Sequence, residues 1–290
     1  MNEFEIDKRE VRRAFSRAAA DYDAAAVLQR EVCARMLERL EYIKLQPERI
    51  LDVGSGTGWG TRRLTQRYPS AQLIALDIAS GMLQAARGHS GWWQKLFGGA
   101  KQIQVCGDME ALPVAANSLD MVWSNLAVQW CNDLPTTFVE LKRVLKVDGL
   151  LMFSTFGPDT LKELRQAFNG VDQHNHLNRF TDMHDIGDML VHSGFAEPVM
   201  DMEYITMTYD DVRGVLQDLK AIGAHNATAG RARGLMGRNA WTRLVENYER
   251  LRSNGKLPAT FEVVYGHAWK LQPRTTHDGR AIVKTSFKLR

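Results

Sequence analysis

Four residues in one short stretch have the types and spacing of a ligand-binding turn. Glycines occupy the alternate positions Gly54, Gly56 and Gly58, and Asp52 lies two residues before the first of them. Glycine permits positive φ angles and lets a ligand lie close against bare backbone. The next apolar stretch closes with Asp77, where a carboxylate would meet the ribose diol of a nucleoside bound to a strand–helix–strand unit. The pattern therefore predicts a nucleoside site.

The spacing of the glycines indicates which nucleoside to expect. A dinucleotide fingerprint needs Gly-x-Gly-x-x-Gly, and its third glycine would fall on Trp59 or Thr61 in the two possible registers. The chain instead reads Asp-x-Gly-x-Gly-x-Gly. This sequence resembles motif I of the class I S-adenosylmethionine-dependent methyltransferases. The resemblance implies S-adenosyl-L-methionine as the cofactor and S-adenosyl-L-homocysteine as the product.

Further candidates lie at the ends of later strands. The predicted third strand ends at Asp108-Met109, a position that hydrogen-bonds the adenine amino group in this superfamily. Segment 125–130 follows the fourth strand, and open α/β sheets bind ligands at the carboxyl ends of their strands. Tyr22, at a break between two predicted helices, either closes over the pocket or packs in the core. The expected cofactor-binding residues are Asp52, Gly54, Ser55, Gly56, Gly58, Asp77, Ile78, Asp108, Met109, Asn125 and Leu126, and the expected catalytic residues are Tyr22, Gln129 and Trp130.

The elements that must position these residues alternate along the chain. Apolar strand-like stretches are separated by helix-like runs, which is typical of a doubly wound α/β sheet with buried parallel strands. The predicted fold is a mostly parallel, seven-stranded, Rossmann-like sheet of the class I methyltransferase type. Its strands are expected at 50–53, 72–78, 103–108, 119–125, 150–156, 199–206 and 261–269.

The chain is expected to divide into four parts. Residues 1–45 form N-terminal helices that cover the pocket, and residues 46–209 together with 260–270 form the core. Residues 210–259 form a helical lid inserted before the last strand, and residues 271–290 form a C-terminal tail.

Composition limits the broad class of the protein. With 290 residues, 44% of them hydrophobic, the chain has enough apolar material for a full core. No apolar run approaches the length of a membrane span, and the acidic N-terminus is not a signal peptide. Cys33, Cys106 and Cys131 are far apart and lack metal-ligand spacing. We expect a cytoplasmic protein with reduced cysteines and no metal.

Charge is unevenly distributed along the chain. Residues 210–290 carry 15 Lys and Arg against 7 Asp and Glu, although the whole chain has a net charge of only +3. The excess is either an ordinary solvated surface or a basic face that attracts an acidic partner. No aromatic-rich nucleic-acid motif accompanies it, so a nucleic-acid partner is not expected.

Five longer segments carry a more specific resemblance. Residues 15–23, 124–130, 153–165, 218–226 and 265–269 look like those of the malonyl-acyl-carrier-protein O-methyltransferases of biotin synthesis. The resemblance implies transfer of a methyl group from S-adenosylmethionine to the free carboxylate of a malonyl thioester, on acyl carrier protein or on coenzyme A. Masking that charge would let fatty-acid synthesis enzymes extend the chain toward the pimeloyl precursor of biotin.

The implied chemistry places few demands on side chains. A malonyl carboxylate is ionised at neutral pH, so catalysis needs in-line placement and exclusion of water rather than a general base. Asn226, Arg231 and His267 are the candidates for binding the acceptor, although a histidine on a strand is more often structural. Arg231, Arg233 and Arg238 of the basic lid are expected to help dock an anionic carrier protein.

Two other functions are compatible with parts of the pattern. One is a methyltransferase acting on a different acceptor, such as a quinone precursor. The other is a non-catalytic nucleoside-binding module that regulates a partner. The intact acidic and glycine motif disfavours the second.

Overall fold

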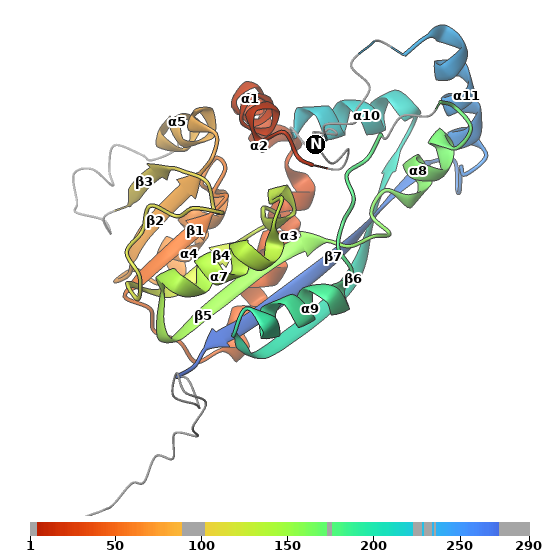
Figure 1. Ribbon diagram of the computed structural model, residues 1–290. Helices are drawn as coiled ribbons and strands as arrows, with labels where there is room; N and C mark the ends of the chain where they lie inside the picture. Colours follow the sequence, from red (N-terminus) through yellow and green to blue (C-terminus); the bar gives the residue numbers. More distant parts are fainter. Residues whose placement is uncertain are drawn as a thin grey trace, which may run out of the picture.

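A computed structural model describes residues 5–88, 102–172, 176–222, 228, 234 and 236–272. Asn226, Arg231, Arg233, Trp92 and Trp93 lie outside the described residues. Seven strands form one sheet in the order β3-β2-β1-β4-β5-β7-β6 (Figure 1). Their bounds are β1 Arg49–Val53, β2 Gln72–Asp77, β3 Ile103–Cys106, β4 Leu119–Ser124, β5 Leu145–Phe156, β6 Ala196–Tyr209 and β7 Leu257–Lys270.

The sheet has the predicted, mostly parallel character. Strands β1 to β5 are parallel to one another, and β7 is antiparallel to both β5 and β6. Val53 pairs with Leu76 at the ends of β1 and β2, so the glycine loop and Asp77 leave the sheet at the same edge. The predicted fold class is confirmed.

The last three strands are longer than predicted. β5 begins at Leu145 and not at residue 150, so Asp148, which has a positive φ of 62°, lies inside the strand. β6 and β7 pair from Ala196 opposite Trp269 to Tyr209 opposite Leu257. Exposed and half-buried residues alternate along the whole of β6. This is a weaker apolar signal than that of a buried strand, and the predicted strand was therefore too short.

Helices cover both faces of the sheet. α3 contacts α4 and β5 on one face, while α7 and α9 contact each other and the strands on the other. Neighbouring strand residues face opposite cores, so that Trp123 joins one apolar cluster and Val122 the other. The helices are α1 Lys8–Ala18, α2 Tyr22–Ala25, α3 Val27–Arg39, α4 Trp59–Arg67, α5 Ser80–Gly88, α7 Leu134–Val144, α8 Lys162–Phe168, α9 Met183–His192, α10 Val212–Ala221 and α11 Arg238–Glu249, with 3-10 turns η1 Leu40–Tyr42 and η2 Val128–Trp130.

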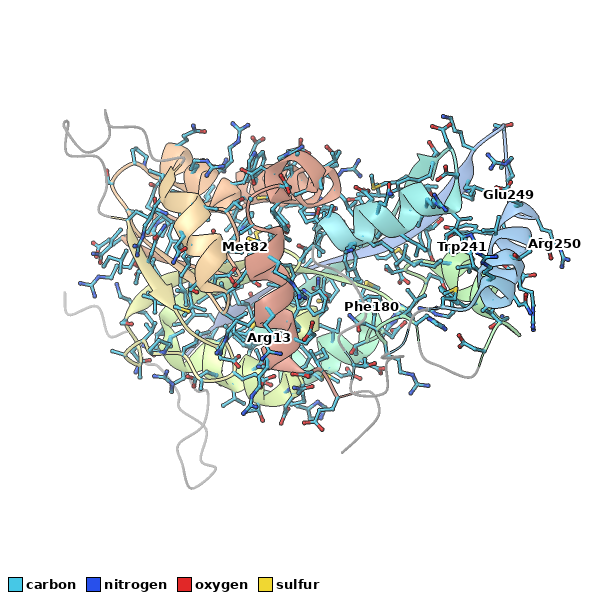
Figure 2. The ribbon with its side chains drawn as sticks, turned by 90° about the horizontal axis from the view of Figure 1, so that it is seen from above. Arg13, Met82, Phe180, Trp241, Glu249 and Arg250 are labelled. Carbon is cyan, nitrogen blue, oxygen red and sulfur yellow. The ribbon has the colours of Figure 1, made fainter. Side chains whose placement is uncertain are left out.

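The N-terminal helices lie over the carboxyl edge of the sheet. The side chain of Asp7 caps α1 by accepting the N–H groups of Arg9 and Glu10. α1 contacts α5, and seen from above Met82 of α5 lies beside α1 (Figure 2). Met82 packs there with Phe15 of α1. The two helices between β6 and β7 separate: α10 contacts α2, whereas α11 packs along α8 (Figure 1). The lid role of segment 210–259 stays a prediction.

None of the helices in the described part of the chain has both the length and the apolar character needed to span a membrane.

Candidate active site

The three glycines of the loop after β1 all have left-handed backbone conformations. Gly54, Gly56 and Gly58 have φ angles of +73°, +54° and +79°. A Cβ atom on Gly54 would overlap the Cβ atom of Ala127, which follows β4. The N–H of Gly54 donates to the carbonyl of Leu76 at 2.8 Å. The loop therefore lies tightly over the ends of β1, β2 and β4, where only glycine fits.

The carboxylate of Asp77 ties this loop to the end of β2. One oxygen accepts the N–H of Gly56 at 2.8 Å, and the other accepts the N–H of Ala79 at 2.8 Å. Asp77 is only 7% exposed, and burial raises its pKa to about 6. The acid predicted to face a ribose lies at the floor of a cavity beside the glycine loop.

A second buried carboxylate lies beneath the loop. Asp52 is 2% exposed and accepts the hydroxyl of Thr61 at 2.5 Å. Burial, with a smaller contribution from Asp77, raises the pKa of Asp52 to about 7. The side chain lines a smaller cavity on the α3 side of the loop.

Asp108, the acid after β3, forms an ion pair with Lys8, a contact that was not predicted from the sequence. Lys8, at the start of α1, places its Nζ atom 2.6 and 2.7 Å from the two oxygens of Asp108 and 2.8 Å from Glu110. Burial alone would lower the pKa of Lys8, but these two carboxylates outweigh burial and raise it. Nothing in the local sequence around Lys8 signals a contact with a residue 100 positions away. The ion pairs fasten α1 to the expected adenine side of the site.

The end of β4 is held by a network of hydrogen bonds. Asn125 donates to the carbonyl of Gln29 at 3.0 Å, and its Oδ1 atom accepts the hydroxyl of Ser154 at 3.0 Å. Leu126 has a positive φ of 49°, and its N–H donates to Ser154. A left-handed conformation in a non-glycine residue is costly and persists only where surrounding contacts enforce it. Leu126 therefore stays in the cavity wall in a fixed position.

Gln129 and Trp130 of η2 form the wall beyond Leu126. The amide of Gln129 donates to the carbonyl of Leu126 at 2.7 Å, and its Oε1 atom accepts the hydroxyl of Thr155 at 3.3 Å. The ring of Trp130 meets that of Phe15 edge to face at 5.3 Å. Both predicted residues line the larger cavity.

Tyr22, the first residue of α2, covers the glycine loop. A Cβ atom on Gly56 would lie 3.9 Å from the Tyr22 ring, and that ring also contacts Phe15. Burial, together with the nearby carboxylates of Asp77 and Asp23, raises the pKa of the Tyr22 hydroxyl. Tyr22 consequently remains a neutral phenol and is unsuited to act as a base.

Most of the predicted residues meet at two adjoining cavities. Both cavities are lined by Tyr22, Gln29, Gly54, Gly56 and Asn125, and Ile222 after α10 reaches the larger one. The larger cavity also contains Asp77, Ile78, Asp108, Met109, Leu126, Gln129 and Trp130, and the smaller contains Asp52 and Ser55. Gly58 lines neither and instead starts α4.

The smaller cavity has polar atoms suited to the amino-acid end of S-adenosylmethionine. The Gln29 Oε1, Ser55 Oγ and Trp123 Nε1 atoms are buried without a hydrogen-bond partner among the described residues, and all three residues line this cavity. Arg30 of α3 lines it as well, with its guanidinium donating to the carbonyl of Asp23. Acceptors, donors and a cation therefore surround a space that fits an ammonium and a carboxylate. Gln29 and Arg30 were not predicted from the sequence, because they lie in an ordinary helical pattern.

His267 is not brought to this site. It pairs with Met152 and Val199 within the sheet, away from the carboxyl end of β5. Burial lowers its pKa. Asn226 and Arg231, the other two acceptor candidates, lie outside the described residues. Within the described ranges, no group of three or more His, Cys, Asp or Glu side chains is arranged to hold a metal ion.

Comparisons with known proteins agree with this geometry. Residues 51–153 match the family model described as a methyltransferase domain. The chain is 76% identical over its full length to the malonyl-[acyl-carrier protein] O-methyltransferase of Gallionella capsiferriformans, with all of both chains covered. This chain belongs to the malonyl-[acyl-carrier protein] O-methyltransferase family. A second member, from Nitrosospira multiformis, is 63% identical over 93% of this chain and 92% of its own.

A solved structure of low sequence identity has the same fold. The YcgJ protein of Bacillus subtilis matches with a TM-score of 0.58 at 17% identity, over 82% of this chain and 98% of its own. At that identity the match speaks for the fold alone.

We expect Gly54→Ala to weaken S-adenosylmethionine binding about fivefold to 150-fold, because forcing an extra methyl into a filled site costs about 1–3 kcal/mol and about 1.4 kcal/mol is a factor of ten. Its Cβ would strike Ala127. Isothermal titration calorimetry gives the affinity. Adding Ala127→Gly should restore part of it, and Gly88→Ala, where a Cβ has open space, should change nothing. Normal binding by Gly54→Ala would contradict this account of the loop.

Asp52→Asn should make the ligand-free protein more stable than the wild type, and this difference in the free energy of unfolding should grow as the pH rises. Burial raises the pKa of Asp52 to about 7, above its unfolded value, so the wild type loses stability between about pH 4 and pH 7. The variant should therefore gain up to about 4 kcal/mol over wild type by pH 8, at about 1.4 kcal/mol per pKa unit. Urea unfolding at pH 5 to 8 measures this difference. For Asp148→Asn, at an exposed left-handed position, the difference in unfolding free energy from wild type should not change with pH. A difference for Asp52→Asn that does not change with pH would refute the burial argument.

Proposed function

We propose that this chain transfers the methyl group of S-adenosyl-L-methionine to the free carboxylate of malonyl-acyl carrier protein. Family membership supports the reaction, and one observation carries the site: a single cavity runs from Asp77 and the glycine loop to Gln129 and Phe156, at the ends of β4 and β5. A nucleoside and an acceptor can thus meet in one enclosure.

The reaction balances without proton transfer. The cofactor supplies an electrophilic methyl group on a sulfonium. The carboxylate oxygen of the acceptor forms a bond to that carbon as the carbon–sulfur bond breaks. One negative and one positive charge disappear together, leaving a methyl ester and a thioether. The protein therefore has to orient two reactants and exclude water, and orientation of this kind can contribute roughly 7–11 kcal/mol.

The described residues suggest how each part of the cofactor is held. Asp77 would accept the ribose hydroxyls, and Asp108 with Met109 would meet the adenine. The amino-acid end would occupy the smaller cavity, where Asp52 and Gln29 accept from the ammonium. Arg30 would pair with the carboxylate. The remaining predicted cofactor contacts, at Ser55, Gly58, Ile78, Asn125 and Leu126, shape the backbone of the same edge.

Tyr22, Gln129 and Trp130 would act on the methyl-transfer side. Tyr22 and Trp130 form an apolar cover with Phe15 that keeps water from the reacting atoms. The fixed amide of Gln129 offers a neutral contact to the acceptor carboxylate, which leaves its electrons more available than a tight ion pair would. Asn226 and Arg231 are proposed to complete the acceptor side, and His267 is proposed to be structural.

The activity is tested with purified protein, methyl-labelled S-adenosylmethionine and malonyl-acyl carrier protein. We expect base-labile label in the carrier-bound product, and none with acetyl- or succinyl-acyl carrier protein. The rate should vary little between pH 7 and pH 9, because the malonyl carboxylate is ionised and Tyr22 stays neutral. Cofactor binding without transfer would redirect the assignment to another acceptor, such as a quinone precursor.

Docking of the carrier protein on the basic segment 210–259 is the second part of the proposal. Arg238 begins α11, is exposed, and together with the other basic residues of this segment would attract an anionic carrier protein. α10 would serve as the lid, since Ile222 at its end lines the cavity.

Arg238→Glu should raise the KM for malonyl-acyl carrier protein about threefold to tenfold, because a charge at the rim of an interface mainly alters association. The effect should shrink at high salt and be absent with malonyl-coenzyme A. Steady-state kinetics with both acceptors measures it, with Arg67→Glu on α4 as the matched control. An equal change with both acceptors would rule out docking through Arg238.

A further inference from the structure

A groove adjoins the larger cavity on the side of β5 and α9. It contains Gln129, Cys131 and Phe156, which also line the cavity, so the two spaces share a wall. Its lining includes no residue of the glycine loop. The groove therefore meets the cavity on the side of Gln129 and Phe156, away from the glycine loop.

The N-terminal segment forms one wall of the groove. The N–H of Ile6 donates to Asn132 Oδ1 at 2.7 Å, and the amide of Asn132 donates back to the carbonyl of Ile6 at 3.1 Å. Ile6 also forms an antiparallel bridge with Thr228. Two residues later, Lys8 holds Asp108. Separate contacts with Asn132, Thr228 and Asp108 therefore hold this wall in place.

Polar and apolar side chains both line the groove. Gln129, which the groove shares with the cavity, contributes an amide, and Thr155 contributes a hydroxyl that donates to it. The apolar lining includes Val128, Leu134, Phe180, Ile186 and Met189. A chain with alternating apolar and amide groups can match such a lining with both kinds of contact.

Arg179 is the one Lys or Arg among the described residues that line the groove, and it is exposed. Its position is fixed from both sides. Asn178 is buried, and the Phe180 ring packs against Phe156 edge to face at 5.6 Å. Seen from above, Phe180 lies between α1 with Arg13 and α11 with Trp241 (Figure 2). Two acids, Glu5 and Asp133, also line the groove, and Asp133 caps α7 through Thr136.

We propose that this groove receives the phosphopantetheine arm of an acyl carrier protein, with Arg179 binding the phosphate and the thioester end reaching Gln129. The proposal rests on the proposed function and adds the route and the recognition element. Arginine is suited to bidentate binding of phosphate. The arm is the part of the carrier that must enter, and its charge at one end and amides along its length match the lining. The carrier protein itself would stay outside, on the surface beside Arg179.

The test compares three acceptors: malonyl-acyl carrier protein, malonyl-coenzyme A and malonyl-pantetheine, which lacks the phosphate. Arg179→Ala should lower kcat/KM about tenfold to hundredfold for the two phosphate-bearing acceptors, because hydrogen bonds to charged groups are strong. With malonyl-pantetheine it should remain within about twofold of wild type, and Arg179→Lys should recover part of the loss. Met189→Trp, which narrows the groove, should impair all three acceptors.

Controls separate this proposal from the proposed function. S-adenosylmethionine affinity should be unchanged in every variant, and Arg13→Ala on the exposed face of α1 should behave as wild type with all acceptors. Failure of the wild type to methylate any malonyl thioester would overturn the function. Equal losses for Arg179→Ala with and without the phosphate, or no loss at all, would overturn the groove assignment alone.

A binding readout is independent of turnover. Holo-acyl carrier protein carries the arm without malonyl, and apo-acyl carrier protein lacks it. Fluorescence anisotropy should show tighter binding of the holo form to wild type and to Arg13→Ala. This preference should disappear in Arg179→Ala and in Met189→Trp. A preference for the holo form that survives both substitutions would place the arm elsewhere.

Discussion

The rest of the site depends on the two hydrogen bonds that Asp77 accepts from the backbone at Gly56 and Ala79. They hold the glycine loop over the carboxyl ends of β1 and β2, in left-handed conformations that a side chain at Gly54 would prevent through contact with Ala127. Because Ala127 follows β4, the same contact sets the distance between the cofactor loop and the acceptor side. The position of Leu126, Gln129 and Trp130 thus follows from the packing of a glycine 70 or more residues earlier in the chain.

This arrangement leaves two carboxylates, Asp52 and Asp77, buried without an ion-pair partner among the described residues, and burial raises the pKa of both to between about 6 and 7. In the ligand-free protein, ionising these buried carboxylates lowers the free energy of unfolding. S-adenosylmethionine carries a positive sulfonium and an ammonium, so a ligand of this kind favours the ionised form of nearby carboxylates. Binding and ionisation should therefore support each other. The Oε1 atom of Gln29 has no hydrogen-bond partner among the described residues and lines the same cavity as Asp52. It is therefore also placed to accept from the ammonium of the ligand.

How well the sequence predicts a contact depends on how far apart the two residues lie along the chain. Asp52, Asp77 and the glycines lie within one strand–helix–strand unit, whose local pattern fixes their relative positions, and their place was predicted. The length of the outer strand β6 was harder to predict, because half of its residues are exposed and its apolar signal is weak. Lys8, Gln29 and Arg30 were missed since each reaches the site from a helix whose docking is decided by packing far along the chain. His267 was a candidate donor to the acceptor carboxylate, although a histidine on a strand is more often structural, and its register places it in the middle of the sheet.

The parts of the site differ in how tightly the fold constrains them. The cofactor side is built from the ends of β1, β2 and β4, where strand pairing and the glycine loop fix the backbone. The groove side is built from the segment before α1, from η2 and from the stretch leading into α9. Fold similarity alone cannot indicate what enters there. The choice of acceptor must come from side chains such as Gln129, Phe180 and Arg179, whose positions depend on how these segments pack.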